Sequence, residues 1–377
     1  MRILHAIYDD VQNPWCGGGG AVRALEISRR LAQRHDITLL SGAYPGAAAQ
    51  EIRHGVRIRR VGTDRSYLLS RLSFSALASS LLARETFDLW VYNFSAFSPI
   101  LTSAGLRRRC VLEFFHRIAG HAVRKLPVFG LPARIAEEYT LRSFNHLVTI
   151  SPSVAKQISR ARGTQGLHLV YTGVDDACFD VPVSEQDYIL YVGRFDVYVK
   201  GIDLLLKAFT QFRADYPDVR LVLAGRATPK RLRQLTSLCD ALEITEHVEI
   251  RGTVSEKTKR ELLGGALFTC MPSRYEGWGI TAIEAAAVGK AVIGTRIPGL
   301  TDAVVHGKTG ILVPPDNTDA LQEAMRQLTE DSEYRRLLGQ SGKLWAKRFS
   351  WDRIARDQES VYEEVLSELR KRDVVHG

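Results

Sequence analysis

The residues best suited to chemistry lie in the segment 272–287. It follows the predicted strand 267–271, holds Gly277 and Gly279 in a turn, and becomes apolar where a helix is expected to begin, at about Ile280. Glycines before a helix N-terminus let backbone N–H groups approach an anion closely, and the helix dipole favours a phosphate there. The segment therefore indicates a site for a phosphorylated ligand, although a plain helix cap has the same pattern.

Two glutamates in this segment, Glu276 and Glu284, have seven residues between them. The neighbours of Glu284 are apolar nearly all round the expected helix, which predicts that the helix is buried. A buried carboxylate needs hydrogen-bond partners, and the hydroxyls of a ribose would satisfy it. Glu276 lies in the preceding loop, where it could bind a sugar hydroxyl. The alternative is a core carboxylate that other protein groups satisfy.

Two cations follow another apolar run, 188–193, that reads as a strand. Arg194 comes directly after the run, and Lys200 lies six residues further on, at the start of the next predicted helix. Arginine offers paired N–H donors and lysine a point charge, and together they suit a diphosphate. A lysine at a helix N-terminus is unfavourable without an anion, which favours this interpretation over two ordinary surface residues.

Four consecutive glycines, residues 17–20, precede the predicted helix 21–34. The dinucleotide-binding fingerprint needs its glycines directly after a strand. Here nine residues separate Gly17 from the strand that ends at Ile7. We therefore interpret the glycine run as a mobile loop, with or without a ligand, and not as that fingerprint.

Short β-branched runs alternate with helical patterns from end to end, which is typical of parallel sheets covered by helices on both faces. The predicted strands are 2–7, 36–41, 56–61, 87–92, 109–115, 145–150, 188–193, 219–224, 247–252, 267–271 and 291–294. The predicted helices are 21–34, 67–84, 151–160, 200–213, 229–241, 255–263, 317–347 and 351–370. The alternation pauses near 172–175. We expect an α/β protein of two doubly wound domains, 1–170 and 171–350, with ligands at the carboxyl ends of the strands in a cleft between them.

The composition fits a globular protein, with 377 residues, 45% of them hydrophobic and 25% charged. This balance excludes disordered and collagen-like classes. No apolar run approaches the roughly 18 residues of a membrane-spanning helix. The five cysteines are scattered without a C-x-x-C pair, which disfavours a disulfide framework or a zinc cluster. His5 and Asp9 interrupt any signal-peptide apolar region, so we expect a soluble cytoplasmic protein.

The net charge of +9 is unevenly distributed. Residues 1–170 hold 23 Lys and Arg against 11 Asp and Glu, whereas residues 171–377 hold 28 against 31. A basic first half suggests an anionic partner, namely a membrane surface, a phosphorylated acceptor or nucleic acid, or simply an arginine-rich surface. The basic residues are spread out and no helix-turn-helix or aromatic-interleaved basic stretch occurs, which argues against nucleic acid.

Glu276 and Glu284, within E-G-W-G-I-T-A-I-E-A, resemble the paired-glutamate signature of family 4 of the retaining nucleotide-sugar glycosyltransferases. Further segments are similar to this family in the right order, namely 147–151, 173–175, 191–195 followed by 200–203, 247–254 and 349–351. The resemblance implies the GT-B fold, with two Rossmann-like domains that face each other across a cleft. It also implies that the chain crosses back near Trp351, so that the helix 351–377 completes the N-terminal domain.

The resemblance implies a role for each matching residue. In the C-terminal domain, Glu284 would bind the ribose, Arg194 and Lys200 the diphosphate, and Glu276 the sugar. The other residues that it implies at the donor site are Thr253 and Val254 beside the base, Gly277, Trp278, Gly279 and Ile280 in the loop, and Gly18 and Gly19 from the N-terminal domain. That domain would bind the acceptor and present His116 near the transferred sugar, with His121 as a close competitor.

We therefore expect a retaining transferase that moves a hexose from a UDP- or GDP-sugar to a hydroxyl of a glycan or lipid-linked acceptor, in cell-envelope polysaccharide or glycolipid synthesis. No cofactor or metal is expected, because there is no D-x-D motif and Asp9-Asp10 and Asp175-Asp176 are poorly spaced chelators. The alternatives are a nucleotide-sugar epimerase, a disaccharide synthase and a non-catalytic nucleotide-sugar-binding scaffold.

The segment 67–84 is rich in leucine and follows the basic run 57–60. Basic residues beside an amphipathic helix suit peripheral attachment to anionic lipid. We therefore consider weak association with the inner face of the plasma membrane, with an ordinary core helix as the alternative.

Overall fold

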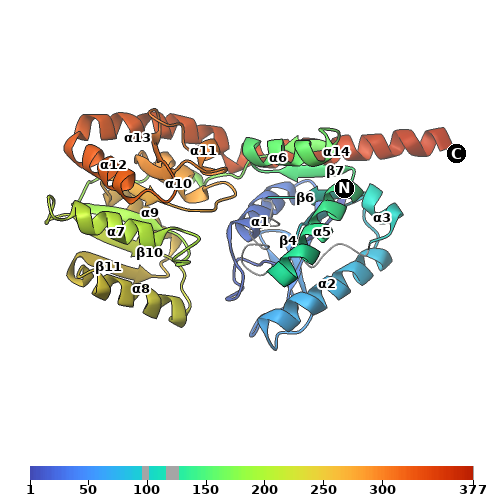
Figure 1. Cartoon of the computed structure of the whole chain (residues 1–377). Helices are drawn as coiled ribbons and strands as arrows, with labels where there is room; N and C mark the ends of the chain where they lie inside the picture. The colour runs from blue at the N-terminus through green and yellow to red at the C-terminus, as the bar shows by residue number, and fades with distance from the viewer. Residues whose placement is uncertain (96–101, 116–126, 377) are drawn as a thin grey trace. The chain divides into compact units, whose positions relative to one another are not determined.

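The computed structural model of the chain describes residues 1–95, 102–115 and 127–376 (Figure 1). Internal contacts divide the chain into two compact units. The first unit comprises Met1–Thr172 together with the segment that begins at Trp351, and the second unit comprises Gly173–Ser350. Each unit is built on its own largely parallel sheet, so the predicted α/β class is confirmed.

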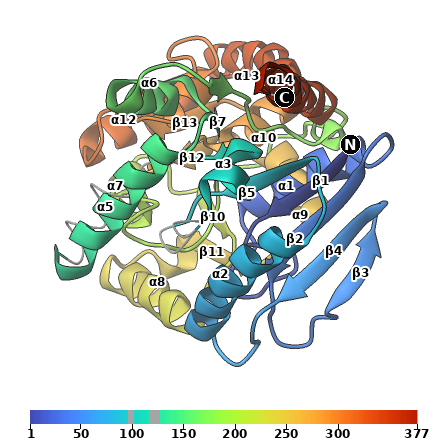
Figure 2. The ribbon, with the colours of Figure 1, turned by 90° about the vertical axis from the view of Figure 1, so that its right-hand side faces the viewer.

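The sheet of the first unit has the strand order β3-β4-β2-β1-β5-β6-β7-β8. Neighbouring strands are parallel except β3 and β4, an antiparallel pair at one edge (Figure 2). The strands are β1 (Arg2–Ala6), β2 (Asp36–Gly42), β3 (Gln50–Arg53), β4 (Val56–Val61), β5 (Leu89–Asn93), β6 (Cys110–Glu113), β7 (His146–Thr149) and β8 (Leu167–Leu169). The helices are α1 (Gly19–Leu31), α2 (Tyr67–Arg84), α3 (Ala104–Arg108), α5 (Pro127–Ser143), α6 (Pro152–Arg162) and α14 (Trp351–His376).

Helices cover both faces of this first sheet. Ile3 and Val91 belong to a buried cluster that includes residues of α1 and α14. Leu4 and Trp90, each displaced by one position along its strand, belong to another cluster that includes residues of α2 and α6. Because successive strand side chains point to opposite faces, α1 and α14 cover one face of the sheet, and α2 and α6 cover the other.

The sheet of the second unit has the order β11-β10-β9-β12-β13-β14, and all neighbours are parallel. Its strands are β9 (Tyr188–Val192), β10 (Arg220–Ala224), β11 (Val248–Gly252), β12 (Thr269–Met271), β13 (Val292–Thr295) and β14 (Gly310–Val313). Its helices are α7 (Ile202–Phe212), α8 (Pro229–Ala241), α9 (Glu256–Gly265), α10 (Ile280–Val288), α11 (Leu300–Ala303), α12 (Thr318–Glu330) and α13 (Ser332–Ala346), with the short 3₁₀ turns η1 (Asp176–Cys178), η2 (Thr245–His247) and η3 (Lys347–Phe349). The winding reverses between β9 and β12, the point at which such sheets bind ligands.

The single helix predicted over 317–347 is wrong, because the structure has two helices there, α12 and α13. Asp331 separates them, and its side chain accepts a hydrogen bond from the backbone N–H of Tyr334. An aspartate that caps a helix in this way starts a new helix and ends the continuous pattern. None of the helices in the described part of the chain is both long and apolar enough to cross a membrane.

Candidate functional site

Two loops of the second unit meet where the winding reverses. One follows β9 and carries Arg194 and Lys200, and the other follows β12 and carries Glu276. At Gly201, whose φ is +64°, a Cβ atom would lie 1.9 Å from the carbonyl oxygen of Pro272. Only glycine fits such a close approach at this backbone angle, so the contact fixes the two loops against each other.

Lys200 and Glu276, which are 76 residues apart in the sequence, form an ion pair between these loops. Lys200 Nζ lies 2.5 Å from Glu276 Oε2, and the side chains are only 15% and 16% exposed. The β12 loop is held from its other side by Gly299, where a Cβ atom would lie 2.5 Å from the carbonyl oxygen of Glu276. Two of the predicted site residues are therefore in direct contact.

Arg194 has a different environment. It is exposed at the carboxyl end of β9, and its guanidinium has no hydrogen bond or ion pair with any residue that the structure describes. By contrast, Arg274 in the neighbouring loop is held by both carboxylate oxygens of Asp203, at 2.7 and 2.8 Å. The buried Tyr191 donates from its hydroxyl to the carbonyl oxygen of Arg194 at 3.0 Å and supports this turn. Arg194 is thus an exposed cation that pairs with no acidic side chain among the described residues.

The remaining loop residues lead into α10. Gly279 caps the helix with a φ of +73°, and Ile280 begins it, as predicted. Trp278 is buried, and its ring packs edge-on against Phe349 at a centroid distance of 5.2 Å. This packing holds the glycine turn, so the backbone N–H groups at the start of α10 are in a fixed position.

Thr253 and Val254 follow β11 and precede α9. Thr253 is exposed and Val254 is half-buried. Because the strands are parallel, these residues lie at the same edge of the sheet as Arg194, with β10 between their strand and β9.

Glu284 has a protein partner that the sequence did not indicate. Lys259 of α9 places its Nζ 2.8 Å from Glu284 Oε1 and 2.6 Å from Glu256 Oε2. Burial raises the pKa of Glu284, and Lys259 opposes this shift. Burial alone would lower the pKa of Lys259, but its two carboxylate partners raise it. Lys259 thus supplies the protein partner of the alternative interpretation at one oxygen of Glu284, and ribose binding by this residue stays a prediction.

The predicted residues Gly18 and Gly19 lie at the N-terminus of α1 in the first unit. Gly18 is the cap, whereas Gly19 and Gly20 already belong to the helix. The predicted loop of four glycines is therefore shorter than expected. His116, like its competitor His121, lies outside the described residues.

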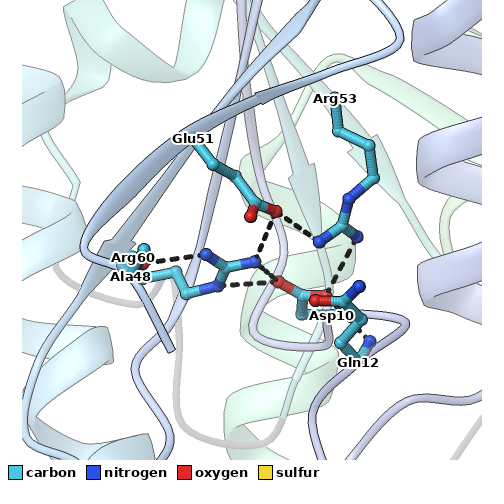
Figure 3. A network of polar contacts seen from close by, with 6 residues as sticks. All are labelled: Asp10, Gln12, Ala48, Glu51, Arg53 and Arg60. Carbon is cyan, nitrogen blue, oxygen red and sulfur yellow. Dashed lines mark hydrogen bonds and ion pairs between the residues drawn. The ribbon is translucent and has the colours of Figure 1, made fainter. Parts of the chain in front are cut away.

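Asp10 holds the loop before α1 (Figure 3). Its Oδ2 accepts hydrogen bonds from Arg60 of β4 at 2.9 and 2.7 Å, and Arg53 of β3 lies 3.7 Å from its Oδ1. Arg60 also binds Glu51 at 2.8 Å. A Cβ atom at Gly17 would lie 2.7 Å from the carbonyl oxygen of Asp10, so the loop packs closely on itself.

Glu113, at the end of β6, is almost fully buried. It pairs with Arg23 of α1, and His5 Nε2 lies 3.5 Å from its second oxygen. Arg23 also donates to Gln358 of α14 at 2.8 Å. Burial alone would raise the pKa of Glu113, but Arg23 and His5 lower it to about 2. This pair lies inside the first unit and connects three elements.

Within the ranges that the structure describes, no group of three or more His, Cys, Asp or Glu side chains could hold a metal ion. The charged groups at the β9 and β12 loops are the side chains of Arg194, Lys200 and Glu276. What they can do chemically is bind a polyanion and hydrogen-bond to hydroxyl groups.

Comparison with known proteins places this chain in a family. Residues 17–177 match the family described as Glycosyltransferase Family 4, and residues 179–345 match Glycosyl transferases group 1. An uncharacterized glycosyltransferase from Methanocaldococcus jannaschii is 25% identical over 97% of this chain and 99% of its own length. The fold and these family matches thus define a two-domain glycosyltransferase.

Solved structures agree on the fold. The sucrose-phosphate synthase of Thermosynechococcus elongatus superposes with a TM-score of 0.84 at 22% identity, covering 98% of this chain and 100% of that one. The Anabaena protein HepE, solved with UDP and glucose, gives a TM-score of 0.73 at 17% identity, covering 96% and 99%. The chain belongs to the group 1 glycosyltransferases and has the GT-B fold.

Proposed function

We propose that this protein is a retaining, metal-independent glycosyltransferase that transfers a hexose from a UDP- or GDP-sugar to a hydroxyl of a glycan or lipid-linked acceptor. The pathway would be synthesis of a cell-envelope polysaccharide or glycolipid. The observation that carries the proposal is Arg194, whose guanidinium pairs with none of the described residues, on the same loop as Lys200 of the Lys200–Glu276 pair, at the point where the winding of the sheet reverses. The complex of HepE with UDP and glucose supports a nucleotide-sugar donor.

The diphosphate would bind to Arg194 and Lys200 and to the start of α10. Its arrival would draw Lys200 from Glu276, so that Glu276 becomes available to accept a hydrogen bond from a sugar hydroxyl. Glu284 would bind the ribose. The base would lie against the backbone at Thr253 and Val254, while Gly18, Gly19 and His116 would contact the donor from the first unit.

Chemistry at this site would be mainly electrostatic. The bond between the anomeric carbon and the diphosphate oxygen breaks, and Arg194 and Lys200 stabilise the negative charge that develops on that oxygen. The acceptor oxygen bonds to the anomeric carbon on the same face, and its proton passes to the departing phosphate oxygen. These two cations and the dipole of α10 supply the positive charge that a metal ion supplies elsewhere, which is why we propose that no metal is needed.

A thermal-shift panel with UDP, GDP, ADP, CDP and TDP, with and without Mg²⁺, tests this donor site. A nucleotide present at about 100 times its Kd adds about 2.7 kcal/mol to the free energy of unfolding. We expect one base to respond equally with and without Mg²⁺. The matching nucleotide sugars would then release diphosphate only with an acceptor present, whereas an epimerase needs none. A protein that responds to no nucleotide would contradict the proposal.

Peripheral membrane association would involve α2. This helix buries a narrow stripe, Ser70, Phe74, Ala78 and Leu82. Its exposed apolar side chains are Tyr67, Leu68, Leu69, Leu72 and Leu77. The first unit also carries the basic excess of the chain. Exposed leucines on a basic unit are complementary to an anionic lipid surface.

We expect the protein to sediment with anionic vesicles more than with neutral ones, and the double variant Leu68→Glu, Leu72→Glu to lose this preference. Leu344→Glu is the matched control, because Leu344 is 68% exposed on α13 of the second unit. Equal sedimentation of the wild type with both vesicle types would overturn the membrane proposal and leave the donor site unaffected.

A further inference from the structure

Lys259 connects two elements that carry predicted donor contacts. It lies in the first turn of α9, shortly after Thr253 and Val254, and its ammonium reaches Glu284 on α10. The side chains of Lys259 and Glu284 are 15% and 13% exposed, whereas Glu256, the other partner of Lys259, is 73% exposed. One shielded cation is therefore shared between a shielded carboxylate and a solvated one.

We infer that Lys259 is a positioning residue which keeps Glu284 ionised and aimed at the ribose, and which thereby sets the preference of the site for ribonucleotide over 2′-deoxyribonucleotide donors. The inference rests on the proposed function, since it concerns the ribose of the same donor. In this role Lys259 acts through Glu284 and does not touch the reacting atoms.

Surrounding charges explain why Glu284 needs this cation. Burial raises the pKa of Glu284 most, and the negative charges of Glu256 and Asp175 raise it further. Lys259 is the group that lowers it. Cys178 also faces Glu284, but its pKa of about 12 keeps the thiol neutral. Arg260 lies 3.6 Å from Asp175 and partly offsets that charge.

The ionisation of Glu284 decides what its side chain can recognise. A carboxylate accepts hydrogen bonds on both oxygens, whereas a protonated carboxyl group becomes a donor at one of them. Lys259 binds Oε1, and Oε2 has no hydrogen-bond partner within the described ranges. Ribose hydroxyls can therefore donate to Oε2 and to the remaining lone pair of Oε1. A site built to bind a hydroxyl rejects a ligand that lacks it, because a shielded polar group is then left unpaired.

The test measures Kd values for UDP, GDP and ADP and for their 2′-deoxy counterparts, by calorimetry on the full chain over a range of pH. For the wild type we expect affinity for the ribonucleotide to rise with pH through the pKa of Glu284, because the ionised form binds the hydroxyls. Lys259→Met keeps the length of the side chain and removes its charge. In that variant the midpoint of the rise moves to higher pH, and the preference for ribonucleotide falls by about tenfold.

Lys257→Met is the matched control. This variant makes the same change on the same helix. Lys257, however, is 83% exposed, and its one ion-pair partner among the described residues is the exposed Glu261, at 3.9 Å. We expect its nucleotide preference and pH profile to equal those of the wild type.

Glu256→Gln is a second variant that tests the inference even if Lys259→Met does not fold. We expect it to fold because the Glu256 side chain is exposed to solvent. It removes a negative charge that raises the pKa of Glu284 and leaves Lys259 to pair with Glu284 alone. The midpoint should therefore move to lower pH, opposite to its movement in Lys259→Met.

The outcomes separate the two proposals. A wild type that binds no nucleotide overturns the proposed function itself. If the wild type binds and Lys259→Met behaves like Lys257→Met, the role of Lys259 is wrong and the donor site stands. If Lys259→Met does not fold, an unchanged midpoint in Glu256→Gln overturns the inference, and a downward shift supports it.

Discussion

Arg194→Ala is expected to lower kcat for donor cleavage by about 10²–10³-fold, the usual cost of removing one preorganised group that stabilises developing charge. Arg194 is exposed at the end of β9, and its guanidinium binds none of the described residues, so the variant breaks no ion pair with them and the fold should persist. The rise in the melting temperature of the variant on addition of the responding nucleoside diphosphate should also be smaller than for the wild type. The measurements are diphosphate release from the matching nucleotide sugar and the thermal shift with the diphosphate.

Arg220→Ala is the control for this experiment. Arg220 is also exposed in the second unit, but it begins β10 and lies at the opposite end of the sheet from Arg194. The variant changes the net charge equally and should behave like the wild type. Full turnover with unchanged nucleotide affinity in Arg194→Ala would show that the diphosphate does not bind at the end of β9.

Glu113→Gln should lower the free energy of unfolding of the first unit by about 3–5 kcal/mol, because it leaves the buried Arg23 without a charged partner. The control is Glu26→Gln on α1, whose pairs with Arg29 and Arg30 are partly exposed. Pairs of that kind contribute about 0–1 kcal/mol. Calorimetry should therefore show a large downward shift of one unfolding transition for Glu113→Gln and almost none for Glu26→Gln.

Glu113→Gln should also lack a pH dependence of the free energy of unfolding that the wild type shows at acidic pH. Glu113 has a pKa of about 2 in the folded protein, below the value of about 4.3 for an unfolded glutamate. The folded state therefore binds its proton less tightly, so the stabilisation is fully present above the unfolded pKa and is lost as pH falls toward the folded pKa. Urea unfolding of the wild type at decreasing pH in this window should show a decline that Glu113→Gln lacks. An equal decline in both proteins would assign the acid sensitivity to other groups.

The fold could be predicted because its strands are apolar and β-branched while its helices are amphipathic, so the alternation is visible in the sequence. Three strands were missed: β14 has the apolar pattern but only four residues, GILV, whereas β3 and β8 lack the pattern. β3 has the sequence QEIR and pairs only at an edge of the sheet. β8 has three residues, and none of them is buried. In such short edge strands the pairing depends on the neighbouring strand and not on their own hydrophobicity.

The candidate site was predictable where it depends on strand ends. Arg194, Lys200 and Glu276 follow two strands that lie side by side, and parallel strands bring their carboxyl ends to one edge of the sheet. The partner of Glu284 was not predictable in this way. Lys259 is one of several charged residues on α9, and only the packing of α9 against α10 selects it. A lysine three residues after a glutamate on a helix is a common surface pattern and gave no reason to expect a shielded ion pair.

Newly synthesised chains must assemble these units in an unusual order. Domains generally fold as units while the ribosome makes them, the N-terminal one first. Here Tyr362 and Val365 of α14 complete the core around β1, and Gln358 holds Arg23, so the first unit stays open until the last helix has emerged. The second unit is one continuous stretch and can close earlier. A ribosome that stalls before Trp351 would therefore release a chain with a finished second unit and an uncovered apolar sheet face in the first unit, a substrate for chaperones and proteases.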